Sequence, residues 1–157
     1  MAQGFFTGSY MENLNITLFD KNDIDGLVKI EKECFSLPFK EKDFLDLYES
    51  EISNVLVAKI GEDVVGYVSF TVILDECQII NFAVSQEYRR QGIGRKIMDA
   101  LLSLCKGKNV TKYFLEVRVS NLSAIKLYEG FGFHTVGTSR GHFKMPTEDA
   151  LLMNLEL

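Results

Sequence analysis

The sequence predicts a mixed α/β fold: a central, mostly antiparallel sheet of about six to seven strands with helices on both faces. Residues 54–84 read as consecutive apolar strands separated by tight turns, which favours antiparallel pairing. Residues 79–106 read as a strand that leads through a glycine-containing turn into an amphipathic helix. Strands and helices then alternate up to the C-terminus, a pattern typical of a sheet covered on both sides.

The length of 157 residues fits one domain, which we expect to occupy residues 11–157. Residues 1–10 are rich in glycine and small polar side chains, and a second methionine, Met11, follows them. We therefore expect residues 1–10 to be a vector-derived remnant or a disordered tail outside the fold.

Residues 15–19 alternate as a short strand, and Asp20 or Asn22 can cap the helix that follows. Pro38 ends this helix, whose apolar face is formed by Ile24, Leu27, Val28, Ile30 and Cys34. A second short helix is expected over residues 40–51. The bulky side chains of this region either complete the core or form one wall of a substrate groove; they are Phe35, Leu37, Phe39 and Phe44.

Three antiparallel strands are expected next. Residues 54–60 and 64–74 form a hairpin with a tight turn at Gly61, and residues 76–84 follow as the third strand. Gly66 lies inside the second strand, where a glycine marks either a bulge or the close approach of another segment.

The C-terminal part of the chain completes the sheet. Residues 113–119 are expected to form a strand, and residues 122–130 a helix that is capped by Asn121. Residues 133–138 and 150–157 are expected to be the last two strands.

The formal net charge of −5 argues against general nucleic-acid binding, which depends on many cationic contacts with phosphates. A cationic cluster nevertheless stands out around the start of the central helix, formed by Arg89, Arg90, Arg95 and Lys96. This cluster suggests a small anionic ligand. Because no apolar run approaches the ~20 residues that span a bilayer, we expect a cytoplasmic protein without membrane association.

The cysteines and histidines predict no metal site. Cys34, Cys77 and Cys105 are odd in number and widely spaced, which favours neither a disulfide framework nor a zinc site. His134 and His142 have no metal-ligand residues nearby, so we expect them to be ordinary buried or surface histidines.

The turn before the central helix, residues 89–95, has the features of an anion site. Gly92 and Gly94 allow a ligand to approach the backbone, and the unpaired amides and dipole of a helix N-terminus attract phosphate. The turn does not match the Walker pattern, and the third glycine of the dinucleotide fingerprint is replaced by Ile97. Taken alone, it is explained as well by a tight turn with solvated arginines.

The pattern Arg/Gln-x-x-Gly-x-Gly/Ala, formed by Arg89, Gly92 and Gly94, resembles the pyrophosphate-binding motif of the GCN5-related N-acetyltransferases. A second motif is more specific. Leu115-Glu116-Val117-Arg118 precedes N-x-x-A-I-x-L-Y-x-x-x-G-F, which runs from Asn121 to Phe133. This combination resembles the RimI-type ribosomal-protein alanine N-acetyltransferases, and the resemblance covers about residues 16–153.

The resemblance implies the fold of that superfamily, with acetyl-CoA as cosubstrate, and it implies site residues. Those along acetyl-CoA are Phe82, Ala83 and Val84, and those around its pyrophosphate are Arg90, Gln91, Gly92, Ile93, Gly94 and Arg95. Asn121 matches a further coenzyme contact, Glu116 the general base and Tyr128 the general acid.

The resemblance also implies the acceptor, which is the N-terminal alanine of small-subunit ribosomal protein eighteen. A terminal amine with a pKa of about 8 is roughly one-tenth neutral at pH 7, whereas a lysine amine near 10.4 is almost fully protonated. The terminal amine therefore needs less activation. The alternatives are an enzyme that acetylates a small amine or a lysine side chain, and a noncatalytic module that senses acetyl-CoA. We expect the protein to be a monomer or a weak dimer.

Glu116 and Tyr128 each have a structural explanation as well. Glu116 could pair with Arg118, since residues two apart in a strand share a face, and Tyr128 could be a core residue with a solvated hydroxyl. His142-Phe143 stand where relatives commonly carry two tyrosines, and Phe39 stands where they carry tryptophan. Peptide specificity is therefore the part of the function that the resemblance constrains least.

Overall fold

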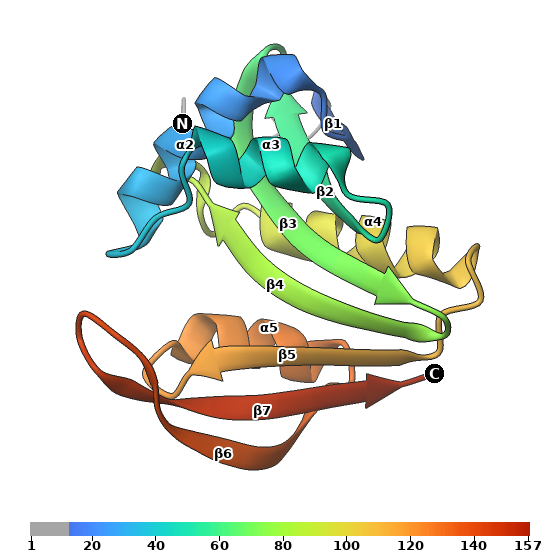
Figure 1. Cartoon of the computed structure of the whole chain (residues 1–157), viewed down its shortest axis with the longest axis vertical. Coiled ribbons are helices and arrows are strands. Elements are labelled where there is room, and N and C mark those ends of the chain that lie inside the picture. Colours follow the sequence, from blue (N-terminus) through green and yellow to red (C-terminus); the bar gives the residue numbers. More distant parts are fainter. Residues whose placement is uncertain (1–12) are drawn as a thin grey trace.

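The computed structural model describes residues 13–157, which form a seven-stranded sheet with helices on both faces (Figure 1). The strands are β1 (Leu14–Leu18), β2 (Ser53–Ile60), β3 (Asp63–Ile73), β4 (Glu76–Val84), β5 (Lys112–Arg118), β6 (His134–Phe143) and β7 (Glu148–Glu156). The helices are α2 (Ile24–Cys34), α3 (Glu41–Glu49), α4 (Ile93–Lys106) and α5 (Leu122–Gly130), with short 3-10 turns η1 (Lys21–Asp23) and η2 (Gln86–Tyr88).

The sheet confirms the predicted fold class. Its order is β1-β2-β3-β4-β5-β7-β6, and within residues 13–157 every pair is antiparallel except β4 with β5. The predicted bounds of β4 and α5 are confirmed, whereas β6 extends to Phe143, well beyond the predicted strand of residues 133–138. None of the helices in this range is long and apolar enough to cross a membrane. The prediction for residues 1–10 lies outside the described residues.

Two hydrophobic cores hold the helices to the sheet. On one side α4 and α5 pack over the strands, with Ile97, Met98 and Leu101 completely buried. On the other side α2 and α3 cover the sheet, with Leu27 and Phe44 completely buried. Each such side chain contributes roughly 2 kcal/mol through burial, which holds the helices against the sheet. Figure 1 shows α2 and α3 in front of the sheet and α4 and α5 behind it.

Gly66 lies both next to a β-bulge and at a close approach of another segment, the two alternatives that its position in the strand predicted. A register shift at Ala58 and Lys59 leaves one extra residue, Val65, on β3 next to this glycine. A Cβ atom at position 66 would also lie 2.9 Å from Ile97 Cδ1 and 3.0 Å from the Ala83 carbonyl oxygen. The missing side chain therefore lets α4 approach β3 and β4 closely.

The parallel strands β4 and β5 separate along their length. Their pairing covers only Glu76–Gln78 opposite Lys112–Phe114. Beyond this point β4 contains a bulge at Ile80, because Asn81 pairs with Ser69 while Ile79 pairs with Phe70. Figure 1 shows the two strands diverging from this end of the sheet. Along the edges where the two strands face each other, the backbone groups of residues 79–84 and 115–118 therefore make no β4–β5 hydrogen bonds.

Candidate active site

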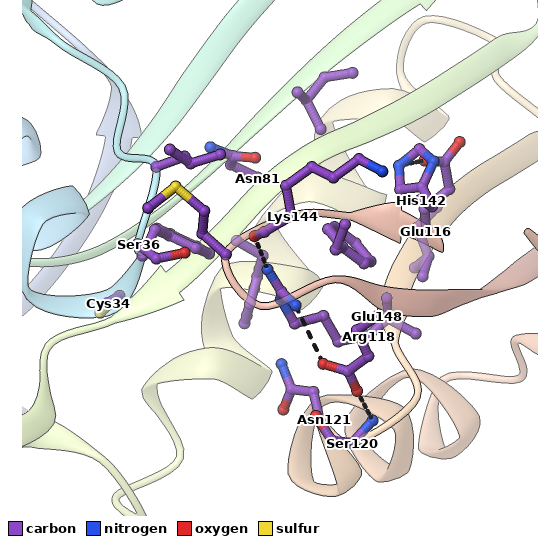
Figure 2. A pocket seen from close by; sticks show the side chains of 18 of the residues that line it. Cys34, Ser36, Asn81, Glu116, Arg118, Ser120, Asn121, His142, Lys144 and Glu148 are labelled. Carbon is purple, nitrogen blue, oxygen red and sulfur yellow. Dashed lines mark hydrogen bonds and ion pairs between the residues drawn. The ribbon is translucent and has the colours of Figure 1, made fainter. Parts of the chain in front are cut away.

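A cavity of about 680 Å³ lies where β4 and β5 diverge (Figure 2). Residues 79–82 of β4 line one side, and residues 115–118 of β5 line the other. The connection between α2 and α3 and the hairpin between β6 and β7 contribute residues from both directions. Of the bulky side chains near α2, Phe35, Leu37 and Phe39 line this cavity, whereas Phe44 belongs to the core.

Four of the predicted site residues line the cavity: Phe82, Glu116, Asn121 and Tyr128. Ala83 is buried in the opposite core, against α2 and α3. Because side chains alternate along a strand, Ala83 presents its main chain, rather than its methyl group, toward the cavity side. Val84 and residues 90–95 lie outside the cavity lining. Residues 90–95 form the turn before α4 and its first residues.

Tyr128 projects from α5 and is only 5% exposed, although it lines the cavity. Its ring lies edge-on to Phe82, with centroids 6.0 Å apart, and tilted against Phe133, with centroids 5.7 Å apart. Burial raises the pKa of the Tyr128 phenol above its ordinary value. The hydroxyl is therefore protonated at neutral pH and is held by apolar neighbours rather than by solvent.

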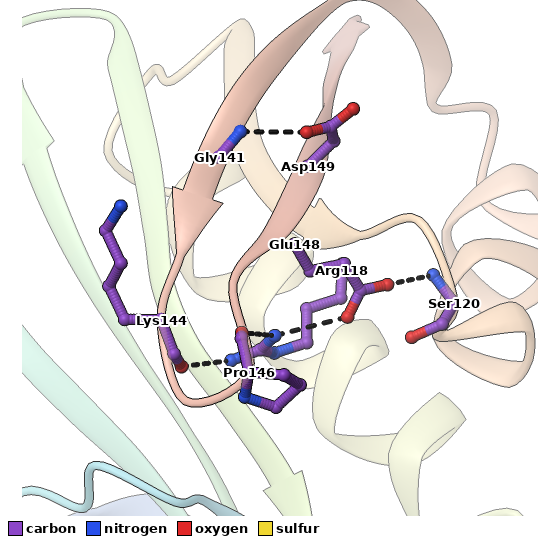
Figure 3. Close-up of polar contacts among 7 residues, drawn as sticks. All are labelled: Arg118, Ser120, Gly141, Lys144, Pro146, Glu148 and Asp149. Carbon is purple, nitrogen blue, oxygen red and sulfur yellow. Dashed lines mark hydrogen bonds and ion pairs between the residues drawn. The ribbon is translucent and has the colours of Figure 1, made fainter.

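Glu116 lies on β5, with 38% of its side chain exposed, and its carboxylate contacts the imidazole of His142 (Figure 2). The structural alternative, a pair between Glu116 and Arg118, does not match the contacts of Arg118. Arg118 instead donates to Glu148 at 3.1 Å and to the carbonyl oxygens of Lys144 and Pro146 at 2.8 and 2.9 Å (Figure 3). Hydrogen bonds from Ser120 and Arg118 lower the pKa of Glu148, so this carboxylate stays charged and fixes the hairpin.

The N-terminus of α4 is built for a close approach by a ligand. Gly92 is the N-cap residue, and its φ of +84° is a left-handed conformation that glycine adopts without strain. Lys96 N donates to Gly92 O at 3.1 Å as the first bond of the helix, which leaves the preceding amides outside the helical ladder. A Cβ atom on Gly94 would lie 3.3 Å from Phe82 Cζ, so this turn packs directly against a cavity residue.

The arginines of the cationic cluster differ in whether the protein itself already engages them. Arg89 is engaged by the protein itself, since it donates to Val84 O at 3.0 Å and to Cys34 Sγ at 3.3 Å. Arg90 is exposed and adopts a left-handed φ of +62°, and the exposed Arg95 lies over the ring of Phe131. In the part of the chain that the structure describes, Gln91 Oε1 is a buried acceptor without a hydrogen-bond partner. Arg90 and Arg95 are thus the cations of the turn that remain accessible to an anion.

One polar group behind the cavity was missed by the sequence analysis. Glu31 of α2 is completely buried and accepts hydrogen bonds from the Tyr67 hydroxyl, from Phe39 N at 2.8 Å and from Asn81 Nδ2 at 3.4 Å. Burial raises the pKa of this carboxyl group. Phe39 and Asn81 both line the cavity, so Glu31 connects two of its walls.

The diverging parallel strands, the glycine turn that opens α4 and the carboxylate and phenol beside the cavity together define an acyltransferase site. Residues 24–133 match the model of the acetyltransferase (GNAT) family, and the chain belongs to this family.

Individual relatives agree with the family match. A homologue from Bacillus subtilis (strain 168) is 35% identical over 132 residues, which covers 83% of this chain and 87% of the homologue. The ribosomal protein bS18-alanine N-acetyltransferase of Escherichia coli (strain K12) is 32% identical over 146 residues, covering 90% of this chain and 97% of its own. The crystal structure of the corresponding Escherichia coli enzyme superposes with a TM-score of 0.84 at 30% identity, covering 91% of this chain and 93% of that one. The protein is therefore an N-acetyltransferase.

Proposed function

We propose that this enzyme transfers the acetyl group of acetyl-CoA to the N-terminal α-amine of a protein in the cytoplasm, and that the acceptor is the N-terminal alanine of ribosomal protein bS18. One observation carries the proposal: the cavity between β4 and β5 holds Glu116 and Tyr128 and adjoins the glycine turn of α4. The names of the homologues support the choice of acceptor.

Acetyl-CoA fits the residues beside the cavity. Its pyrophosphate would bind the amides of Gly92, Ile93, Gly94 and Arg95, with Arg90 and Arg95 as counter-charges and Gln91 as a polar neighbour. Its pantetheine arm would follow the unpaired edge of β4 along the main chain of Phe82, Ala83 and Val84. Asn121 accepts from Ala124 N at 3.3 Å as the cap of α5, which leaves its amide N–H groups to donate to the coenzyme.

The two polar cavity residues suit direct acetyl transfer. Glu116 removes a proton from the acceptor ammonium, and the neutral amine then attacks the thioester carbonyl. The tetrahedral intermediate collapses as the C–S bond breaks and Tyr128 donates its proton to the departing thiolate. The second proton of the amine nitrogen passes through water to the Tyr128 phenolate, and Glu116 releases the first proton to solvent. The products are the acetylated amine, the coenzyme thiol and one released proton, without any covalent enzyme intermediate.

The acceptor assignment is tested by incubating the protein with acetyl-CoA and the N-terminal peptide of bS18 and following release of coenzyme thiol. Release above background is expected with this peptide and not with the same peptide already acetylated at its N-terminus. A lysine-containing peptide with a blocked N-terminus and a polyamine serve as competing acceptors. Faster turnover of either one, or coenzyme binding by calorimetry without any turnover, would contradict the proposal.

The glycine turn gives a separate prediction. A Gly92→Val substitution is expected to raise the Kd of acetyl-CoA about tenfold, because a β-branched residue at φ +84° costs on the order of 1–2 kcal/mol and displaces the turn amides. Gly92→Asn is the matched control, since asparagine tolerates the left-handed region. Calorimetry measures both variants. Equal affinities for valine and asparagine would show that the turn geometry does not govern coenzyme binding.

A further inference from the structure

We propose that His142 is a positioning residue of the acceptor site, whose Nε2–H group holds the Glu116 carboxylate in the orientation that receives the acceptor's proton. The proposal rests on the function proposed above and extends it to a residue that the sequence analysis treated as an ordinary histidine.

The contact lies inside the cavity rather than on an outer surface. His142 Nε2 and Glu116 Oε2 form an ion pair or charge-assisted hydrogen bond, and both residues line the cavity. Their side chains are 37% and 38% exposed, and a pair this accessible adds little to folding stability. Its effect is therefore on orientation: the imidazole engages Oε2, and the second oxygen, Oε1, is the one proposed to receive the acceptor's proton.

A bulge in β6 directs His142 to this place. Ser139 pairs with Ala150 and Phe143 pairs with Glu148, so β6 carries three residues opposite Asp149 alone. Gly141, at the middle of the bulge, has a left-handed φ of +61° and donates from its amide to Asp149 Oδ1 at 2.8 Å (Figure 3). Bulges characteristically change the direction of a side chain, and this one places His142 over β5.

The bulge is anchored by the same strand that carries Glu116. The imidazole of His142 lies edge-on to Phe143, with centroids 4.8 Å apart, and the Arg118 guanidinium lies 4.7 Å from the Phe143 ring centroid. Arg118 also binds the hairpin carbonyls and Glu148, as described above (Figure 3). Since Arg118 and Glu116 are two residues apart on β5, the strand sets the position of both members of the contact.

The test measures kcat and both KM values for His142→Leu and His142→Gln, with His134→Leu as the control. His134 is exposed at the start of β6 and lies outside the cavity lining. His142→Leu should lower kcat about tenfold without changing the KM of acetyl-CoA, because one hydrogen bond to a charged group is lost. His142→Gln should recover most of this loss, because its Nε2–H group can donate from a similar position. Parent-like turnover of the leucine variant, or a glutamine variant no better than leucine, overturns the proposal.

A double-mutant cycle separates positioning from a general structural effect. In a Glu116→Gln background, His142→Leu should cause no further loss, because its effect passes through the carboxylate. An equal loss in both backgrounds overturns the proposal.

The contact can also be tested without turnover. The ring ¹⁵N resonance of His142 Nε2 should shift on Glu116→Gln while that of His134 does not, and an unchanged resonance refutes the contact. A parent protein that releases no thiol, with this shift present, would instead count against the proposed function alone.

Discussion

Replacing Tyr128 by phenylalanine is expected to lower kcat by about a thousandfold, within the 10²–10⁴-fold range typical of general acid–base catalysis. The substitution removes the hydroxyl that protonates the departing thiolate but keeps the ring, with its contacts to Phe82 and Phe133. Affinity for acetyl-CoA should therefore stay within about twofold, because the apolar contacts that position the ring survive. Steady-state kinetics and calorimetry on the same preparation separate these two effects.

The direction of the pKa shift adds a pH test. Because burial raises the pKa of Tyr128, its acid form is lost only as the pH rises through a value above the ordinary 10 or so. Parent kcat should therefore show no decline due to this group between pH 7 and about 10.

The control for this experiment is Tyr48→Phe. Tyr48 lies on α3, is 41% exposed and does not line the cavity, so kcat should match that of the parent. Parent-like turnover of the Tyr128 variant at every pH would remove the phenol from the mechanism and leave the thiolate to be protonated by water.

The predictable parts of the fold are those encoded by local patterns. β4 and α5 begin and end where expected, because apolar alternation and the cap at Asn121 mark them within a few residues. The C-terminal half of β6 was missed because residues 139–143 are mostly polar and contain a glycine. That half is a strand through its pairing with β7, and such long-range register leaves no local pattern.

Site residues that belong to a sequence motif could be predicted, whereas contacts between segments far apart in the sequence could not. Glu116 belongs to the Leu115–Arg118 motif and Tyr128 to the motif that ends at Phe133, and both residues line the cavity. Their catalytic roles stay predictions. The contact between Glu116 and His142 was missed, because the bulge that brings His142 to β5 depends on the β6–β7 register. Glu31 did have a local signal: it lies seven residues after Ile24 and four after Leu27, on the apolar face of α2. A carboxylate at such spacing indicates a buried polar partner.

The Glu31→Ala substitution is expected to reduce the free energy of unfolding by about 3 kcal/mol, since it leaves the buried Tyr67 hydroxyl and Phe39 amide without their acceptor. Chemical denaturation at pH 7 measures this loss. The KM of the acceptor peptide should also rise, because Phe39 and Asn81 are cavity walls that Glu31 holds, while the KM of acetyl-CoA should change little. A variant as stable as the parent would show that the carboxylate is not needed to pair these groups.

Glu31→Gln separates the charge of this group from its hydrogen bonds. Glutamine keeps one acceptor oxygen and about the same volume, but it does not titrate. Burial raises the pKa of Glu31, so the folded state holds the proton more tightly than the unfolded state. The stabilisation from the protonated carboxyl is fully present below the unfolded pKa of about 4.3, and it is lost as the pH rises through the raised folded pKa. The glutamine variant should therefore gain stability relative to the parent as the pH rises above about 4.3, until the pH has passed the raised pKa of folded Glu31. A pH-independent difference between the two proteins would contradict the burial of an ionisable group at this position.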